Sequence, residues 1–230
     1  MLLALLASCG CTRSRAPEDV RPAELPEFLE AHCADVAFPI REPPDFPPVD
    51  GPTRGLMVEV LREFGIAGEE FDGYTWLVAE RTPSRVALLG QPGEAAPREW
   101  GLASIVDDGQ GWTLDKFGVC RVELTAPGFG NARFVLNPEI APDPASPELA
   151  VLIMERACAS GQPPVGREIR PVVTEDELQV TVVVLVEPVQ GGADCPGNPW
   201  HPVTIELEEA LGDRMVYDGS THPPWERTWP

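Results

Sequence analysis

The sequence has few of the residues that most often carry chemistry. Its 230 residues include two tyrosines, one lysine (Lys116) and three histidines, and the histidines His32, His201 and His222 are widely spaced. None of them falls in a metal-binding pattern such as H-E-x-x-H. The nucleophile motifs G-x-S-x-G and S-x-x-K and the glycine-rich phosphate loops are also missing. We therefore expect no catalytic residues, no metal site and no cofactor.

Positive charge is scarce as well. The chain has 37 acidic and 17 basic residues, which gives a formal net charge of −20. Such a surface repels phosphate backbones, so nucleic acid is not expected as a partner. Solubility alone explains the excess of acid, although a cation-responsive module is a third hypothesis beside the two given below. Calorimetric titration with calcium that gave no heat would remove that hypothesis.

No long hydrophobic run is present, because no segment approaches the 18 apolar residues of a membrane-spanning helix. The first eight residues carry no charge, and they end in Leu6-Ala7-Ser8 before Cys9. An aliphatic residue, two small residues and a cysteine resemble the end of a bacterial lipoprotein signal peptide. The resemblance implies cleavage before Cys9 and acylation, palmitate included, of that cysteine. Cys11 fits less well, because Ser8 would stand where an aliphatic residue belongs.

The start of the chain departs from the lipoprotein pattern in one respect. Its apolar stretch is short, and no Lys or Arg precedes it. An apolar terminal segment packed into the fold is the alternative, but charged and Pro-rich sequence follows at once. Because two or more acyl chains anchor a protein firmly, we expect it on the extracytoplasmic face of the cell membrane, with the lipid bilayer as a partner.

Residues 9–54 are expected to form a Pro-rich tether after a signal peptide of residues 1–8. Prolines concentrate between Ile40 and Pro52, which favours polyproline II, a spacer that extends about 3.1 Å per residue. A short helix over Glu24–Ala34 is a weaker prediction.

Residues 55–65 predict a helix, because Leu56, Val60, Leu61 and Phe64 share one face and Gly65 supplies a stop. From Tyr74 onward the pattern changes to strands. Residues 75–79 and 86–89 predict one hairpin, and 101–106 and 112–114 predict another with an Asp-Gly turn. Further strands are expected at Arg133–Leu136, Ala150–Met154, Ile169–Val173, Leu178–Val186, Val203–Leu207 and Arg214–Tyr217.

The pattern therefore predicts a mostly β fold of antiparallel hairpins, sandwich-like, with one or two short N-terminal helices. Residues 76–81 resemble residues 151–156, which would fit two tandem β-units or coincidence equally well. The expected division is a helix plus β-unit over 55–140, a disulfide-braced β-unit over 141–222, and a tail over 223–230.

Six cysteines are present, and export would place them in an oxidising compartment. If Cys9 carries lipid and Cys11 lies in the tether, Cys33, Cys120, Cys158 and Cys195 remain, with three possible connectivities. We favour Cys158–Cys195, which brackets the hairpin 169–187, and Cys33–Cys120, which would pin the N-terminal segment to the body. The spacing of the cysteines does not match that of a metal site.

Acidic residues cluster at 107–108, 175–177 and 206–209. Paired carboxylates can hydrolyse glycosides when they face each other, but the first two clusters fall in predicted turns and the third alternates along a strand. Trp200, Trp225 and Trp229 stand among prolines. Exposed tryptophan can bind sugars or peptides, although a tail packed along a sheet or left free explains the last two more simply.

Short segments of the C-terminal part have a recognisable sequence pattern: Glu155–Gln162, Cys195–Pro199, Leu211–Arg214 and Asp218-Gly219. Over roughly residues 74–224 the chain resembles a group of exported proteins of high-GC Gram-positive bacteria to which no activity is assigned. The resemblance supports a Cys158–Cys195 pair, since both cysteines lie inside matching segments.

The sequence as a whole predicts a membrane-anchored lipoprotein that binds or scaffolds a protein or polymer of the cell envelope without catalysis. A cell-wall polymer hydrolase that uses paired carboxylates is the alternative.

Overall fold

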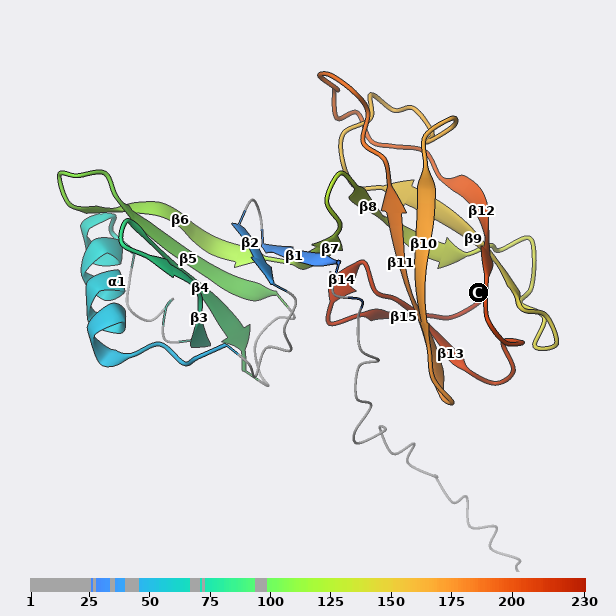
Figure 1. Ribbon diagram of the computed structural model, residues 1–230, viewed down its shortest axis with the longest axis horizontal. Coiled ribbons are helices and arrows are strands. Elements are labelled where there is room, and N and C mark those ends of the chain that lie inside the picture. Colours follow the sequence, from blue (N-terminus) through green and yellow to red (C-terminus); the bar gives the residue numbers. More distant parts are fainter. Residues whose placement is uncertain are drawn as a thin grey trace, which may run out of the picture.

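The computed structural model describes residues 26, 28–33, 36–39, 46–66, 71, 73–93 and 99–230. Within them the fold is mostly β, as the sequence predicts, with one helix, α1 (Gly51–Glu63), and three sheets. Figure 1 shows two lobes, α1 with β3–β6 and the larger β8–β13 assembly, and small strands between them. None of the described helices is long and apolar enough to span a membrane.

The helix α1 begins earlier than predicted. Asp50 accepts a hydrogen bond from the Thr53 amide at 2.7 Å and so caps the first turn, while Pro52 occupies a first-turn position where its missing amide is not needed. The helix ends as predicted, with Gly65 at φ +74° just after it. Its inner face packs on the adjoining sheet through Thr53, Met57, Val60 and Leu61.

That sheet is an antiparallel meander in the order β3-β4-β5-β6. Both predicted hairpins lie in it, and both turns fall where the sequence places them. The strands are β3 (Tyr74–Thr82), β4 (Arg85–Pro92), β5 (Trp100–Asp107) and β6 (Trp112–Cys120).

The second lobe is built on a seven-stranded sheet in the order β12-β9-β8-β11-β13-β15, with β10 beside β11. All six later strands of the prediction are present. The strands are β8 (Gly130–Leu136), β9 (Glu148–Glu155), β10 (Ile169–Glu175), β11 (Gln179–Val186), β12 (His201–Glu206), β13 (Met215–Asp218) and β15 (Trp225–Arg227). All pairs are antiparallel except β11 with β13, which run parallel.

A third sheet, in the order β14-β7-β1-β2, lies between the lobes (Figure 1). Its strands are short: β1 (Glu30–Cys33), β2 (Val36–Pro39), β7 (Val122–Thr125) and β14 (Thr221–His222). None of the four was predicted. β1 pairs with β7, which lies about ninety residues further along the chain, so residues 30–33 are part of the body.

The predicted tether is therefore corrected in its described portion. Residues 30–33 form a strand where a short helix was proposed over Glu24–Ala34, and residues 36–39 form the next strand. Val49 and Pro47 hydrogen-bond to β3 through Trp76 and Val78, and helix α1 begins at Gly51. The lipobox, the signal peptide and the tether up to residue 25 lie outside the described residues.

Two other expectations about organisation also differ from the structure. The boundary expected at residue 140 falls between β8 and β9, which pair directly. The similar segments 76–81 and 151–156 lie in β3 and β9, in sheets of different strand order, so tandem units gain no support. The tail contributes β15, which pairs with β13.

Three apolar clusters hold the fold together. One fills the space between α1 and β3–β6, and one lies inside the seven-stranded sheet. The third is central and combines residues of β1, β4, β5, β7, β10 and β11. Every residue of β11 is buried, because Val182 and Val184 face the second cluster while Val183 and Leu185 face the central one.

Candidate functional site

The cysteines pair as the sequence analysis favoured. Cys33 bonds to Cys120 with Cα atoms 5.6 Å apart, and Cys158 bonds to Cys195 with Cα atoms 4.7 Å apart. The first bridge ties the end of β1 to the end of β6, and the second closes the segment that contains β10 and β11. Cys9, the predicted lipidation site, lies outside the described residues.

Two of the four segments that carry the resemblance, Glu155–Gln162 and Cys195–Pro199, meet at the second disulfide. Ser160 donates its amide to the Asp194 carbonyl, and the Asp194 amide donates to the Ser160 hydroxyl at 3.0 Å. The Asn198 side chain donates to the carbonyls of Glu155 and Ala157. These hydrogen bonds hold the two loops together, so Ser160, Asp194 and Asn198 have structural roles.

Two of the three acidic clusters hold turns through their aspartate side chains. Asp107 and Asp108 each accept a hydrogen bond from a backbone amide two residues ahead, at 2.9 Å. Asp176 does the same for the amides of Leu178 and Gln179 in the β10–β11 turn. Glu206 is exposed on the edge strand β12. Nothing in these contacts matches the two facing carboxylates that a glycosidase needs.

The best-buried carboxylates are all held by arginine. Glu155 receives two hydrogen bonds from Arg167, at 2.8 and 2.6 Å, and this bonding raises the pKa of Arg167. Asp218 pairs with Arg227 at 2.5 Å, and it also accepts the amides of Phe134 and Ser220.

Glu175 pairs with Arg214 at 2.6 Å in the same manner. Bidentate or multiply bonded pairs of this kind fix strands to each other, and they leave the carboxylates without a free proton-transfer partner.

The three histidines are not brought together. His32 lies on β1 beside Glu30 at 3.5 Å, His201 begins β12, and His222 on β14 lies against the Trp100 ring with centroids 5.9 Å apart. Among the described residues no group of three or more His, Cys, Asp or Glu side chains is placed to hold a metal ion.

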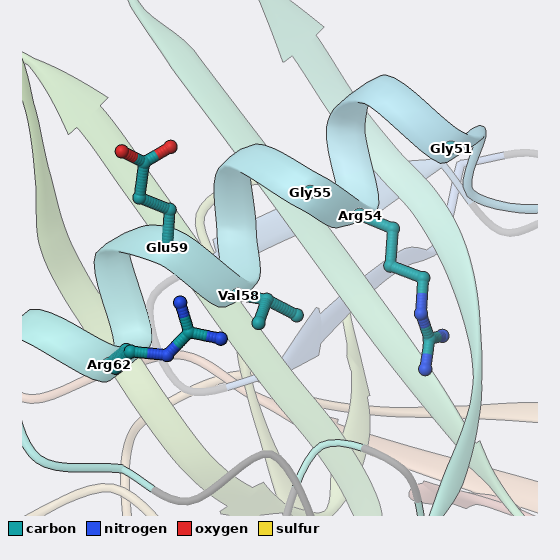
Figure 2. A pocket seen from close by; sticks show the side chains of 6 residues that line it. All are labelled: Gly51, Arg54, Gly55, Val58, Glu59 and Arg62. Atoms are coloured by element: carbon teal, nitrogen blue, oxygen red, sulfur yellow. The ribbon is translucent and has the colours of Figure 1, made fainter.

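A shallow hollow lies on the outer face of α1 (Figure 2). It exists because Gly51 and Gly55 have no side chains, and Arg54, Val58, Glu59 and Arg62 surround it. Its polar side chains are exposed and none is aimed into an enclosed space, so the hollow does not form a site for chemistry.

The feature that stands out is a row of arginines and tryptophans where the third sheet meets β8 and β9. We call it the arginine–tryptophan surface and define it by Arg121, Arg133, Arg156, Trp200 and Trp225. The Arg121 guanidinium lies 5.2 Å from the Trp225 ring centre, and that of Arg133 lies 5.4 Å from the Trp200 ring centre. Both tryptophans are 40% exposed.

Local pairing brings these residues together from distant parts of the chain. Arg133 lies on β8 opposite Met154 of β9, and the Arg156 amide bonds to the Asn131 carbonyl one step further along the same ladder. Arg156 reaches across to Glu123 of β7 at 3.2 Å, and Arg121 lies two residues before Glu123.

The charges of this surface act on one another. Burial lowers the pKa of Arg156, the carboxylates of Glu123 and Asp218 oppose that shift, and the positive charges of Arg121 and Arg133 lower the pKa further. A local concentration of cations therefore exists on a chain whose net charge is −20. Sequence analysis noted the two tryptophans but not the arginines, which come from other strands.

No protein-family model matches the chain, and no curated protein and no solved structure matches it either. The candidate site therefore depends on its own geometry alone.

Proposed function

We propose that the protein is a lipid-anchored, extracytoplasmic binding module without catalytic function. The observation that carries the proposal is how the six cysteines divide. Four of them form two disulfides, which suits an oxidising compartment outside the cytoplasm. The remaining two, Cys9 and Cys11, lie in the N-terminal segment, and Cys9 ends the lipobox-like Leu6–Cys9.

The non-catalytic part of the proposal is supported by how the carboxylates are used. The best-buried acids are paired with arginine, and the clusters at 107–108 and 175–177 bond to their own turns. No observation favours the alternative of a cell-wall hydrolase. The exposed arginine–tryptophan surface instead suits recognition, since tryptophan and arginine are the residues most enriched at binding hot spots.

Anchoring is tested by producing the full chain in a bacterium that processes lipoproteins, with a fatty acid that carries a clickable label. The expected result is a labelled protein in the membrane fraction whose intact mass fits acylated Cys9 and two disulfides. Cys9→Ala should lose both the label and the membrane association, while the matched Cys11→Ala variant should keep them. Label that persists in Cys9→Ala, or six reduced thiols in the extracted protein, would contradict the proposal.

A further inference from the structure

The arginine–tryptophan surface contains two arginines that differ from most of the others. Seven arginines of the described chain form ion pairs with carboxylates: Arg81, Arg85, Arg156, Arg167, Arg170, Arg214 and Arg227. Arg121 and Arg133 lie within ion-pair distance of no described carboxylate, and both are exposed. On a chain with more than twice as many acids as bases, exposed arginines without a carboxylate partner are unexpected.

Each of these two arginines is held by an aromatic ring rather than by an acid. A guanidinium over a tryptophan face keeps its N–H edges pointing outward, where they can meet an oxyanion in bidentate fashion. Arg133 is held further by a contact of its Nη2 with the Met154 sulfur at 3.0 Å. The side chains are therefore arranged before a ligand arrives, which lowers the entropy lost on binding.

A second arginine stands beside each of the two. Arg227 lies 5.9 Å from the same Trp225 ring as Arg121, and Arg156 is close enough to Arg133 to feel its charge. Both Arg227 and Arg156 are held by carboxylates, at 2.5 Å from Asp218 and 3.2 Å from Glu123, and their Nε groups are buried. They therefore add positive charge beside Arg121 and Arg133 and do not offer free donors. The outward N–H edges of Arg121 and Arg133 suit phosphate, because its oxygens accept the fork of a guanidinium in bidentate fashion and its negative charge is favoured by the additional arginine nearby.

We propose that the arginine–tryptophan surface binds a slender phosphate-bearing polymer, with phosphate groups at Arg121 and at Arg133. The inference rests on the proposed binding function and names the ligand class of that module. A polymer fits because Arg121 and Arg133 are exposed on an open surface and do not line a cavity. A broad anionic surface, such as a membrane or a nucleic-acid duplex, fits poorly because it would also approach the acidic remainder of a chain of net charge −20. A slender strand that follows the arginines avoids most of that repulsion.

The test uses the full chain carrying Cys9→Ala, made under oxidising conditions, so that no acyl chain can hold it on a lipid surface. Binding of medium-chain inorganic polyphosphate is followed by calorimetry and by the fluorescence of the exposed tryptophans over a range of salt concentrations. Arg121→Gln and Arg133→Gln should each weaken binding about tenfold, since each removes one charge-assisted contact. Each should also flatten the dependence of log K on log salt by about 0.7, as for a flexible polyanion.

The matched control is Arg170→Gln. Arg170 also stacks on an aromatic ring, 4.4 Å from the centre of Phe129, but it is paired with Glu168 at 2.8 Å. Its substitution should leave both affinity and salt slope unchanged. Equal losses in all three variants would overturn the inference, as would a wild-type chain that does not bind polyphosphate.

Two comparison probes decide the ligand class. Poly-L-glutamate of similar length should bind more weakly, and equal binding would overturn the assignment to phosphate. Phosphatidylglycerol vesicles should not compete with polyphosphate, and effective competition would assign the surface to a membrane instead. Because the Cys9→Ala chain is used throughout, failure here leaves the anchoring experiment unaffected, and the reverse also holds.

Discussion

Asp218 is one of two carboxylates that the described chain buries almost completely, with 1% of the residue exposed. It holds Arg227 and two backbone amides, and one of these, from Phe134, lies on β8 beyond the residues that pair with β11. Asp218→Asn removes the negative charge that faces the mostly buried guanidinium of Arg227. It also places the N–H donors of the new side-chain amide against one of the groups that donate to Asp218. We expect a loss of about 3 kcal/mol in the free energy of unfolding, measured by urea denaturation.

The control for this variant is Asp213→Asn, a similar change at an exposed position with no side-chain hydrogen bond in the described structure. It should change stability by no more than about 0.5 kcal/mol. Equal stability of Asp218→Asn and the wild type would show that Arg227 finds another partner or enough water.

The lowered pKa of Asp50 predicts how the stability of the protein depends on pH. The Thr53 hydroxyl, then the Thr53 amide, then Arg81 lower the pKa of Asp50 from 3.8 to about 2. Because the folded pKa is below the unfolded one, the charged cap stabilises the protein fully above about pH 4. That contribution disappears as the pH falls through 2. Asp50→Asn keeps a capping oxygen but does not titrate.

The measurement is the difference in urea midpoint between the wild type and Asp50→Asn at several pH values. We expect the wild type to exceed the variant by a constant margin above pH 4 and the margin to shrink between pH 4 and 2. The contributions of all other carboxylates to the pH dependence are the same in both proteins and cancel in this comparison. A margin independent of pH would mean that the cap is not coupled to the charge of Asp50.

At the scale of elements, the two disulfides close segments of different length. Cys33–Cys120 spans 87 residues and Cys158–Cys195 spans 37. In the chain-entropy model these loops correspond to about 4.6 and about 3.8 kcal/mol. Replacing both cysteines of the first pair by alanine should therefore destabilise the protein more than the same change in the second pair.

The comparison is made by urea denaturation of the two double variants, with the mass of each confirming the remaining disulfide. Larger destabilisation by loss of Cys158–Cys195 would show that the bonds around Ser160 and Asn198 depend on that bridge. In that case the local loops, and not the chain entropy, would set its contribution.

A further prediction about stability concerns β11, because this strand contributes side chains to two apolar clusters. Leu185 is fully buried against the central cluster, while its neighbours on either side face the second cluster. Leu185→Ala should destabilise the protein by about 3 kcal/mol. Leu178→Ala, at a position 64% exposed just before the strand, should change little. Similar thermal shifts in the two variants would contradict a shared core at β11.

The elements that could be predicted from sequence were those whose signal is local. The hairpins show apolar runs with turn residues between them, and β11 contains an unbroken apolar run from Val182 to Val186. Asp50-Gly51-Pro52 was read as tether because of its proline, although an acidic cap followed by proline in the first turn is also a helix start.

The missed strands and the candidate site have a common cause. β1 contains Glu30 and His32 among its four residues and is stabilised by pairing with β7, far along the chain. Patterns of hydrophobic periodicity detect relations between residues that are close in sequence, and they cannot detect a partner strand that is distant along the chain. The arginine–tryptophan surface is likewise assembled from distant places: the junction of β6 and β7, the strands β8 and β15, the residue after β9 and the residue before β12. No single stretch of sequence therefore displays it.

At the scale of the whole molecule, the net charge of −20 opposes compaction. Salt screens repulsion between exposed carboxylates across the surface, and it affects enclosed pairs such as Arg167–Glu155 much less. The net effect of added sodium chloride should therefore be stabilising. If screening relieves about 1 kcal/mol, the melting temperature should rise by roughly 2 to 4 °C between low and moderate ionic strength.

The double variant Arg121→Gln/Arg133→Gln sharpens this experiment. It makes the chain two units more negative without removing any ion pair within the described structure, so its melting temperature should rise more steeply with salt than that of the wild type. Chloride is the appropriate anion, because sulfate also strengthens apolar burial. A melting temperature that falls with salt in both proteins would mean that the arginine–carboxylate pairs contribute more than the collective repulsion.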